Sequence, residues 1–225
     1  MANARSGRST ARLPEPVNKI TPYQRLKEAI RAGDLIPGQQ LVESVLAEWC
    51  EVSRTPIREA LSKLQHDGLV ERNDRGLVVR ERSPEEVLDI YETRIALEGT
   101  AARMAAERRN SHDLILLRRA MARLEELGTE EVDVMVRANR QYHTAVWRAS
   151  HNSSLIDLLE RLDLHLVRYP ANTLESPGRW ERSNEQHRAI AEAIEARDAD
   201  GAEKCAVAHF TEARDIQLAL FDETL

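Results

Sequence analysis

Apolar residues recur every three or four positions through most of the chain, which is the spacing of one face of an α-helix. Beyond residue 82 this spacing predicts about six amphipathic helices, with Asn, Gly, Pro and Asp residues at the breaks. The helices expected there span residues 84–108, 111–127, 130–150, 153–170, 178–197 and 200–222. No segment of this part alternates as a β-strand does, so we expect an all-helical bundle.

Before residue 82 the pattern is different, because three short helices precede a β-hairpin. We expect helices over residues 22–32, 43–50 and 53–67, and strands over residues 69–72 and 77–80. The turn-forming sequence Asn73–Gly76 separates the two strands. Two helices joined by a short turn, the second of them basic, are typical of a helix-turn-helix.

Two helix starts divide the chain. Thr21 and Ser83 each precede a proline and have Gln or Glu three positions on, which is the capping-box arrangement. Asp200 and Glu203 form a further capping pair at the last helix. The charge balance also changes near Ser83, with 14 Lys and Arg against 11 Asp and Glu before it, and 18 against 27 after it. We therefore expect a flexible basic arm (1–20), a head (21–82) and a body (83–225).

Composition excludes several classes of protein. With 42% hydrophobic and 31% charged residues, the chain is expected to be soluble and globular. No apolar run reaches the ~18 residues of a membrane span, and the start lacks the apolar region of a secretory signal. Its Arg- and Ser-rich character leaves an organellar transit peptide as the alternative to a basic arm. Cys50 and Cys205 lie far apart, which favours a reducing compartment, the cytoplasm.

The start of the third helix concentrates groups that bind DNA. Two arginines and two hydroxyls, Ser53, Arg54, Thr55 and Arg58, fall within one and a half turns. Free N–H groups and the positive end of the helix dipole favour phosphate there, and arginine can donate two hydrogen bonds to guanine or phosphate. The alternative is an ordinary capped surface helix. The preceding helix and the following hairpin favour the DNA-binding interpretation.

Three of the seven histidines share a helix face with apolar residues. His143 lies one turn after Asn139 on such a face, and His187 and His209 lie on two others. Buried polar groups need partners, and a divalent metal held by three nitrogens, with oxygen completing its shell, would provide one. Periodicity alone leaves structural histidines as the alternative.

Arg94 is in phase with Ile90, Leu97 and Ala101, so we expect it to face inward. A buried guanidinium needs an anion. One interpretation is an internal salt bridge to Glu98, one turn on. The other is a clamp for a ligand carboxylate whose second oxygen reaches the metal.

The head contains a long motif, Val52–Leu61, with the sequence Val-Ser-Arg-Thr-Pro-Ile-Arg-Glu-Ala-Leu, and shorter ones at Pro37–Leu41, Leu46–Glu48 and Asp67–Val70. Together they resemble the winged helix-turn-helix of the GntR family of transcription regulators. The resemblance implies that Arg54, Thr55 and Arg58 contact the major groove of DNA and that the wing tip enters the minor groove. The predicted DNA-binding residues are therefore Ser53, Arg54, Thr55, Arg58, Arg75 and Gly76.

The body carries the elements Asn139–His143, Glu185–Ile190 and Ala208–His209, whose key residues are 4, 44 and 22 positions apart. They resemble the metal-site pattern of the FCD domain found in the FadR subfamily of GntR regulators. The resemblance implies a metal held by Asn139, His143, His187 and His209, with zinc as the leading candidate and nickel or manganese as others. It also implies that Arg94 binds the carboxylate of an effector.

Three positions depart from the family pattern. Ser44 stands where many relatives have Arg, Glu51 where the turn often has Gly, and Asn139 where the metal site often has Asp. The first two could alter operator preference. The third removes one negative charge from the metal site, so metal affinity and preference could change.

The combined interpretation is a mainly α protein with an N-terminal winged helix-turn-helix and an all-α, FCD-like bundle. We expect a homodimeric regulator, a repressor as in most relatives, that binds double-stranded operator DNA and responds to a small organic acid at the metal site. It is not expected to be an enzyme. The alternatives are a regulator for which the metal ion is the signal, or a metal-dependent hydrolase with Glu185 as its base.

Overall fold

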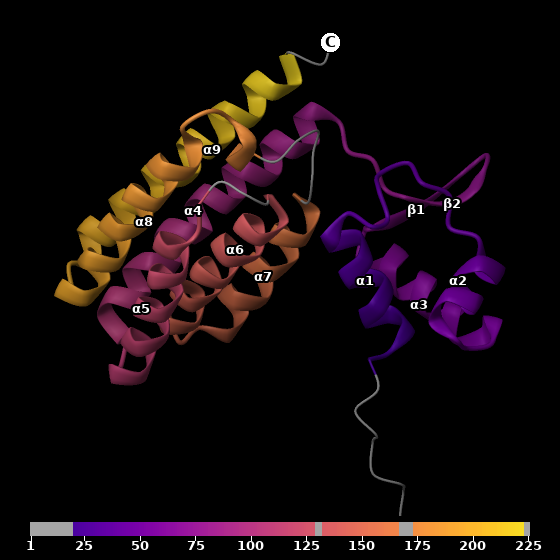
Figure 1. Cartoon of the computed structure of the whole chain (residues 1–225), viewed down its shortest axis with the longest axis horizontal. Helices are drawn as coiled ribbons and strands as arrows, with labels where there is room; N and C mark the ends of the chain where they lie inside the picture. The colour runs from indigo at the N-terminus through magenta and orange to yellow at the C-terminus, as the bar shows by residue number, and fades with distance from the viewer. Residues whose placement is uncertain (1–19, 129–131, 167–172, 223–225) are drawn as a thin grey trace, which may run out of the picture.

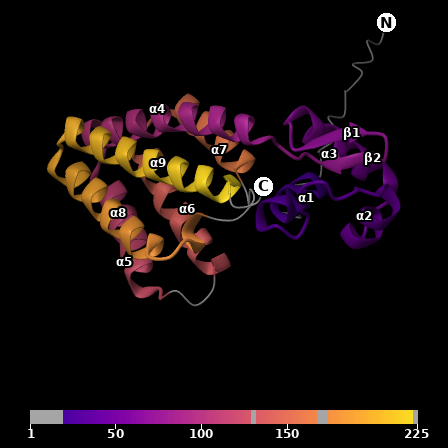
Figure 2. The same ribbon diagram turned by 90° about the horizontal axis from the view of Figure 1, so that it is seen from above.

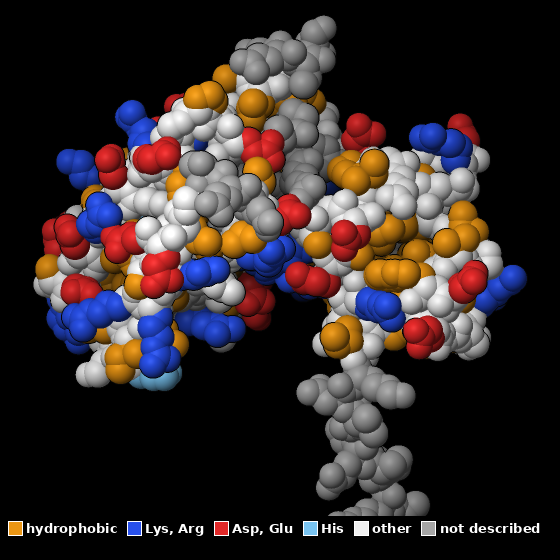
Figure 3. Space-filling view, viewed as in Figure 1, with side chains coloured by type: hydrophobic (Ala, Val, Ile, Leu, Met, Phe, Trp, Pro, Cys, Tyr) orange, Lys and Arg blue, Asp and Glu red, His pale blue; other side chains and the backbone are white. Residues whose placement is uncertain are grey.

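The computed structural model of the chain describes residues 20–128, 132–166 and 173–222. Its smaller part, the head, lies beside the larger helical body (Figure 1). Acidic and basic side chains are interspersed over the face of both parts seen in Figure 3. The basic arm expected over residues 1–20 lies outside the described residues except for Ile20.

The head contains three helices and a two-stranded wing. Its elements are α1 (Pro22–Ala32), α2 (Glu43–Cys50), α3 (Arg54–His66), β1 (Val70–Asn73) and β2 (Gly76–Val79). The strands are antiparallel with Asn73 opposite Gly76, so Asp74 and Arg75 form the turn. The core of the head includes Leu26, Ile30, Leu46, Ile57, Leu61 and Leu64. The expected helices and hairpin are confirmed.

Local capping explains where several helices begin and end. Thr21 and Ser83 both form the complete capping boxes that the sequence predicts, before α1 and before α4 (Pro84–Arg108). Gly68 follows α3 with φ +72°. Its N–H donates to Gln65 O at 3.1 Å, and the N–H of Leu69 donates to Leu64 O at 2.9 Å. This is a Schellman ending, in which the left-handed residue is usually glycine.

The body is a bundle built around α4. Its other elements are α5 (Ser111–Glu126), α6 (Val132–Ala149), α7 (Ser153–His165), the short 3-10 helix η1 (Thr173–Glu175), α8 (Arg179–Ala196) and α9 (Ala199–Asp222). Helix α4 contacts α6, α7, α8 and α9, and it runs beside α9 in both views (Figures 1 and 2). A Cβ at Gly99 would lie 2.7 Å from Val207 Cγ2 of α9, so glycine permits this close approach.

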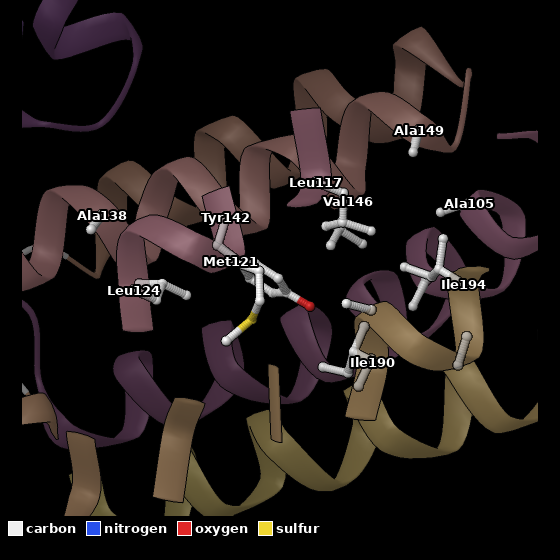
Figure 4. Close-up of a cluster of buried hydrophobic side chains, with 14 of the residues drawn as sticks. Ala105, Leu117, Met121, Leu124, Ala138, Tyr142, Val146, Ala149, Ile190 and Ile194 are labelled. Atoms are coloured by element: carbon white, nitrogen blue, oxygen red, sulfur yellow. The ribbon is translucent and has the colours of Figure 1, made fainter. Parts of the chain in front are cut away.

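Small aliphatic residues fill much of the body core. Ala102, Ala105, Ala106 and Ala202 are fully buried, and Leu117, Met121, Val146 and Ile190 pack in the same cluster (Figure 4). Tyr142 also lies in this cluster, and its hydroxyl donates to His187 O at 2.7 Å. Aliphatic side chains thus fill most of the core, as expected for a chain with only 4% aromatic residues.

One predicted helix start is wrong. Helix α9 begins at Ala199, and Asp198 rather than Asp200 accepts a hydrogen bond from the Gly201 N–H, at 2.9 Å. Asp200 and Glu203 both pair with Arg103 instead. Among the described residues, no helix has the length and apolar character needed to cross a membrane.

Candidate DNA-binding surface and candidate metal centre

The start of α3 presents four of the residues predicted to bind DNA. Ser53, Arg54, Thr55 and Arg58 are all exposed, while Ile57 between them is fully buried. Ser53 is the N-cap of α3, but its side chain makes no capping hydrogen bond. The first N–H groups of the helix are therefore open to a phosphate oxygen.

Arg58 is already engaged within the head. Its Nε lies 2.6 Å from Oε2 of Glu43, the first residue of α2. The Arg58 side chain is 65% exposed, so this pair contributes only about 0–1 kcal/mol. Glu43 precedes Ser44, which is exposed. A contact between Arg58 and DNA would therefore have to compete with the Glu43 carboxylate at this corner of the head.

The wing brings Arg75 to the tip of the hairpin. The Arg75 N–H donates to Asn73 Oδ1 at 2.9 Å, and Gln40 Nε2 donates to Arg75 O at 2.5 Å. These bonds fix the backbone of the turn while the Arg75 side chain stays exposed. Gly76 has φ +108°, a conformation that residues with a Cβ rarely adopt.

The turn before α3 contains a strained residue. Glu51 has φ +58° and ψ +42°, in the left-handed region. For a residue other than glycine this conformation costs roughly 1–2 kcal/mol. Glycine would adopt this conformation without that cost, so the left-handed backbone of Glu51 agrees with the glycine that the family pattern implies at this turn.

Three histidines from three helices meet inside the body. His143 of α6, His187 of α8 and His209 of α9 place one ring nitrogen each within 4.8 Å of the others. All three are buried, with exposed fractions of 3%, 0% and 3%. The sequence predicted this convergence from three separate apolar faces.

The three imidazoles are held neutral. Burial is the main cause of the lowered pKa of each, and nearby Arg179 lowers all three further; the pKa of His187 falls to about 3. Neither ring nitrogen of His187 has a hydrogen-bond partner among the described residues. Neutral imidazoles with unused lone pairs are the form that binds metal.

Gln186 fixes the orientation of one ring. Its Oε1 lies 2.8 Å from Nδ1 of His209 and accepts from Nη1 of Arg179 at 2.9 Å. Because a guanidinium only donates, this oxygen is an acceptor, and His209 Nδ1 must carry the proton. The Nε2 lone pair of His209 is then left for another partner.

Asn139 lies one turn before His143, and both residues line a cavity inside the body. Its Oδ1 is buried and lacks a hydrogen-bond partner among the described residues. A buried amide oxygen without a donor is costly. Asn139 and the histidines thus form a donor set of three nitrogens and one oxygen, which suits a divalent transition metal.

Arg94 is buried and paired within the body. Its Nε donates to Glu98 Oε1 at 3.1 Å, and its Nη2 lies 3.4 Å from Asp163 Oδ1. Glu98 also accepts from Trp147 Nε1 at 2.6 Å, and burial raises the pKa of Glu98 to about 7 despite Arg94. The internal salt bridge is therefore present, and Arg94 also borders the cavity.

A cavity of ≈ 230 Å³ joins these groups. His143, His209, Asn139 and Arg94 form part of its wall, and Arg31 of helix α1 reaches it from the head. The pocket therefore extends from the candidate metal centre to the DNA-binding part of the molecule.

Comparison with known families identifies both parts of the chain. Residues 21–79 match the model of the bacterial regulatory proteins of the gntR family, and residues 89–212 match the FCD domain. The chain belongs to the GntR family and carries an FCD domain. It is thus a DNA-binding transcriptional regulator with an effector-binding domain, and the proteins it resembles are regulators rather than enzymes.

Several GntR-type regulators are similar over nearly their whole length. The Bacillus subtilis protein YdhC, an uncharacterized HTH-type transcriptional regulator, is 32% identical over 86% of this chain and 90% of its own. LutR of the same organism is 31% identical over 87% of this chain and 99% of its own. The structure of E. coli McbR/YncC matches with a TM-score of 0.78 and 23% identity, over 89% of this chain and 96% of its own, which supports the fold.

The sequence analysis missed three residues that contact the candidate metal centre or the cavity beside it. Asp163, Gln186 and Arg179 contact Arg94, His209 or each other. Gln186 stands next to His187, so a search for side chains that orient metal ligands would have found it. Asp163 and Arg179 lie near the end of one helix and at the start of another, where periodicity gives no signal.

Proposed function

We propose that operator binding by this regulator is controlled by a small carboxylate metabolite bound at a metal site in the FCD domain. One observation carries the proposal: three neutral, buried imidazoles meet, and two of them, His143 and His209, line the same cavity as Arg94. A protein that kept these residues only for structure would leave His187 and Asn139 without partners at a considerable cost.

The residues present fit a divalent ion. His143, His187, His209 and Asn139 would hold it, with zinc the leading candidate and nickel or manganese the others. When bound, the ion supplies a positive charge that attracts a carboxylate oxygen. Gln186 keeps His209 in the tautomer that offers Nε2 to the site.

Arg94 would bind the other carboxylate oxygen of the effector. Its contact with Asp163 is the longer of its two ion pairs, at 3.4 Å against 3.1 Å for Glu98. A ligand carboxylate that approaches from the cavity would therefore replace Asp163 first. Asp163 would retain its second partner, Arg140 Nε, at 2.9 Å.

The segment Asp163–His165 at the end of α7 offers a path from this site to the DNA. Leu164 is buried in the core cluster of the head. His165 lies beside Arg82 and against Gly68, the residue that ends the DNA-binding helix α3. Loss of the Arg94–Asp163 contact would thus free Asp163 to move, and with it the next two residues, Leu164 and His165, which contact the head.

On the DNA side, Ser53, Arg54, Thr55 and Arg58 would enter the major groove and Arg75 with Gly76 the minor groove. We further propose a homodimeric repressor that acts in the cytoplasm. Two copies of α3 would then need to lie ~34 Å apart, or a multiple of this, to read successive major grooves.

The metal site is tested with zinc, nickel and manganese on chelator-treated protein. We expect one of them to bind at one ion per chain and to raise the melting temperature, with small carboxylates raising it further only in the loaded protein. His187→Gln should weaken metal binding at least tenfold, whereas His112→Gln, at an exposed position, should not. Equal metal binding by wild type and His187→Gln would contradict the proposal.

The same samples separate the alternative in which the ion is the signal. In that case loading with metal changes operator affinity when no acid is present. Loading with a resident metal should leave operator affinity unchanged until an acid is added, whereas a signalling metal should change operator affinity by itself and reverse that change on mild chelation.

A further inference from the structure

The cavity holds a second buried arginine. Arg179, the first residue of α8, borders it, and its side chain is 2% exposed. Its Nη1 donates to Gln186 Oε1 at 2.9 Å, but its Nε has no partner among the described residues. A guanidinium with an unused donor in the wall of a cavity is a site for an anion.

Among the described residues, one carboxylate, that of Glu212, forms an ion pair with Arg179, and Glu212 also pairs with Arg182. Glu212 Oε1 lies 3.6 Å from Arg179 Nη1 but 2.7 Å from Nε of Arg182, which is 67% exposed. Gln186 Nε2 donates to the other oxygen of Glu212 at 2.5 Å. Burial accordingly lowers the pKa of Arg179 more than Glu212 raises it. The positive charge of Arg179 is therefore incompletely balanced.

The wider cavity has the same imbalance. Among the described residues its wall carries the five arginines Arg31, Arg94, Arg137, Arg140 and Arg179, against the three carboxylates Glu28, Asp133 and Asp163. Asp163 is itself divided between Arg94 and Arg140. A ligand with one negative charge would offset only part of this excess of positive charge.

We propose that Arg179 is a second anion anchor, and that the effector is a dianion whose two acid groups bind Arg94 and Arg179. The inference rests on the proposed function, because it assigns the first acid group to Arg94 and the metal. The two arginines come from α4 and α8 and line the same cavity, so a ligand with two acid groups can offer one to each. The ligand class is a short diacid, such as a dicarboxylate or a phosphorylated acid.

The test uses metal-loaded protein and matched acids in calorimetric titrations. The diacids are succinate, glutarate, adipate and 3-phosphoglycerate, and the monoacids of equal chain length are butyrate, valerate, hexanoate and glycerate. We expect at least one diacid to bind tenfold or more tightly than its monoacid. Arg179→Gln should remove this preference by lowering diacid affinity at least tenfold more than monoacid affinity, because any loosening of Gln186 and His209 affects both classes of acid alike.

Arg182→Gln is the matched control. It removes the other arginine that pairs with Glu212, which lies outside the cavity wall, and it should keep the preference for diacids. Arg179→Lys guards against misfolding, because it retains the charge and should keep part of the preference. Equal binding of diacids and monoacids by wild type, or an unchanged preference in a folded Arg179→Gln, would overturn the inference and leave the proposed function standing. If no acid of either class binds in a manner that needs Arg94, both fail.

Discussion

Arg94 and Glu98 form a buried ion pair that serves the fold and borders the ligand site at once. Glu98 is 2% exposed and accepts hydrogen bonds from Arg94 and Trp147. A buried pair adds little net stability because desolvation offsets the attraction between the charges, but removal of one partner leaves the other uncompensated. The two residues should therefore be strongly coupled.

We predict that Arg94→Met lowers the free energy of unfolding by about 3–5 kcal/mol at pH 8, because Glu98 and Asp163 lose their shared partner. The double variant Arg94→Met/Glu98→Gln should recover much of this loss. The cost of the single variant should shrink at pH 6, since protonation neutralises Glu98, whose pKa is already about 7 and rises further without Arg94. Urea unfolding of wild type, the two single variants Arg94→Met and Glu98→Gln, and the double variant measures the coupling; additive losses would contradict it.

Glu43 differs from Glu98 because its pair with Arg58 is exposed, so under the proposed function it would compete with DNA for Arg58. We predict that Glu43→Gln strengthens binding to an operator fragment about two- to fivefold, the effect of removing an ion pair worth about 0–1 kcal/mol. Glu48→Gln removes the same charge from an exposed position of the same helix and should have a smaller effect. Fluorescence anisotropy at two salt concentrations measures both. Weaker binding by Glu43→Gln would show that Glu43 assists DNA binding instead.

The sequence predicted individual residues where their signal was local. His143, His187 and His209 were found because each lies on the apolar face of its own helix, and burial of a polar group on such a face implies a partner. Asp163 and Arg179 could not be found in this way, since their importance comes from contacts with helices far away in the chain. The same holds for the pairing of Arg58 with Glu43 across two helices.

At the scale of elements, helix ends were predictable and helix packing was not. The caps at Thr21 and Ser83 place the starts of α1 and α4 at the expected residues. The close approach of α4 and α9 depends on Gly99, which no local sequence motif singles out. Most unexpected is the end of α7, where Leu164 packs into the core of the head.

His165, which follows Leu164, makes this contact sensitive to pH. Burial, Arg82 and Arg80 lower its pKa to about 4, and Asp67 opposes them. The unfolded histidine titrates near ~6.5, so the folded protein binds fewer protons. The stability provided by this contact is thus complete above pH ~6.5 and is lost as the pH falls toward 4.

We predict that titration of His165 lowers the free energy of unfolding of wild type by at most about 1.4 kcal/mol per pH unit below pH 6.5. The partial exposure of His165 makes the actual decrease smaller. His165→Gln should show a shallower fall in melting temperature between pH 7.5 and 5 than wild type. His112→Gln, at an exposed position, should follow wild type. Parallel curves for His165→Gln and wild type would contradict the assignment.

At the scale of the whole molecule, one cavity reaches from His143 and His209 of the body to helix α1 of the head. The head, with its exposed arginines on α3 and the wing, is held against the body through the end of α7. Occupancy of the cavity and the position of the head are therefore expected to depend on each other. An almost complete shift between two positions requires a ligand preference of ~10⁴-fold for one of them.

The central claim is tested by measuring the affinity of metal-loaded protein for a native promoter fragment, with and without an acid that raises its melting temperature. We predict at least a tenfold change in Kd for wild type, and no response in Arg94→Met/Glu98→Gln, which should still bind DNA. Arg54→Ala/Arg58→Ala should lose sequence-selective binding altogether. An unchanged Kd for wild type when the cavity is occupied would contradict the account.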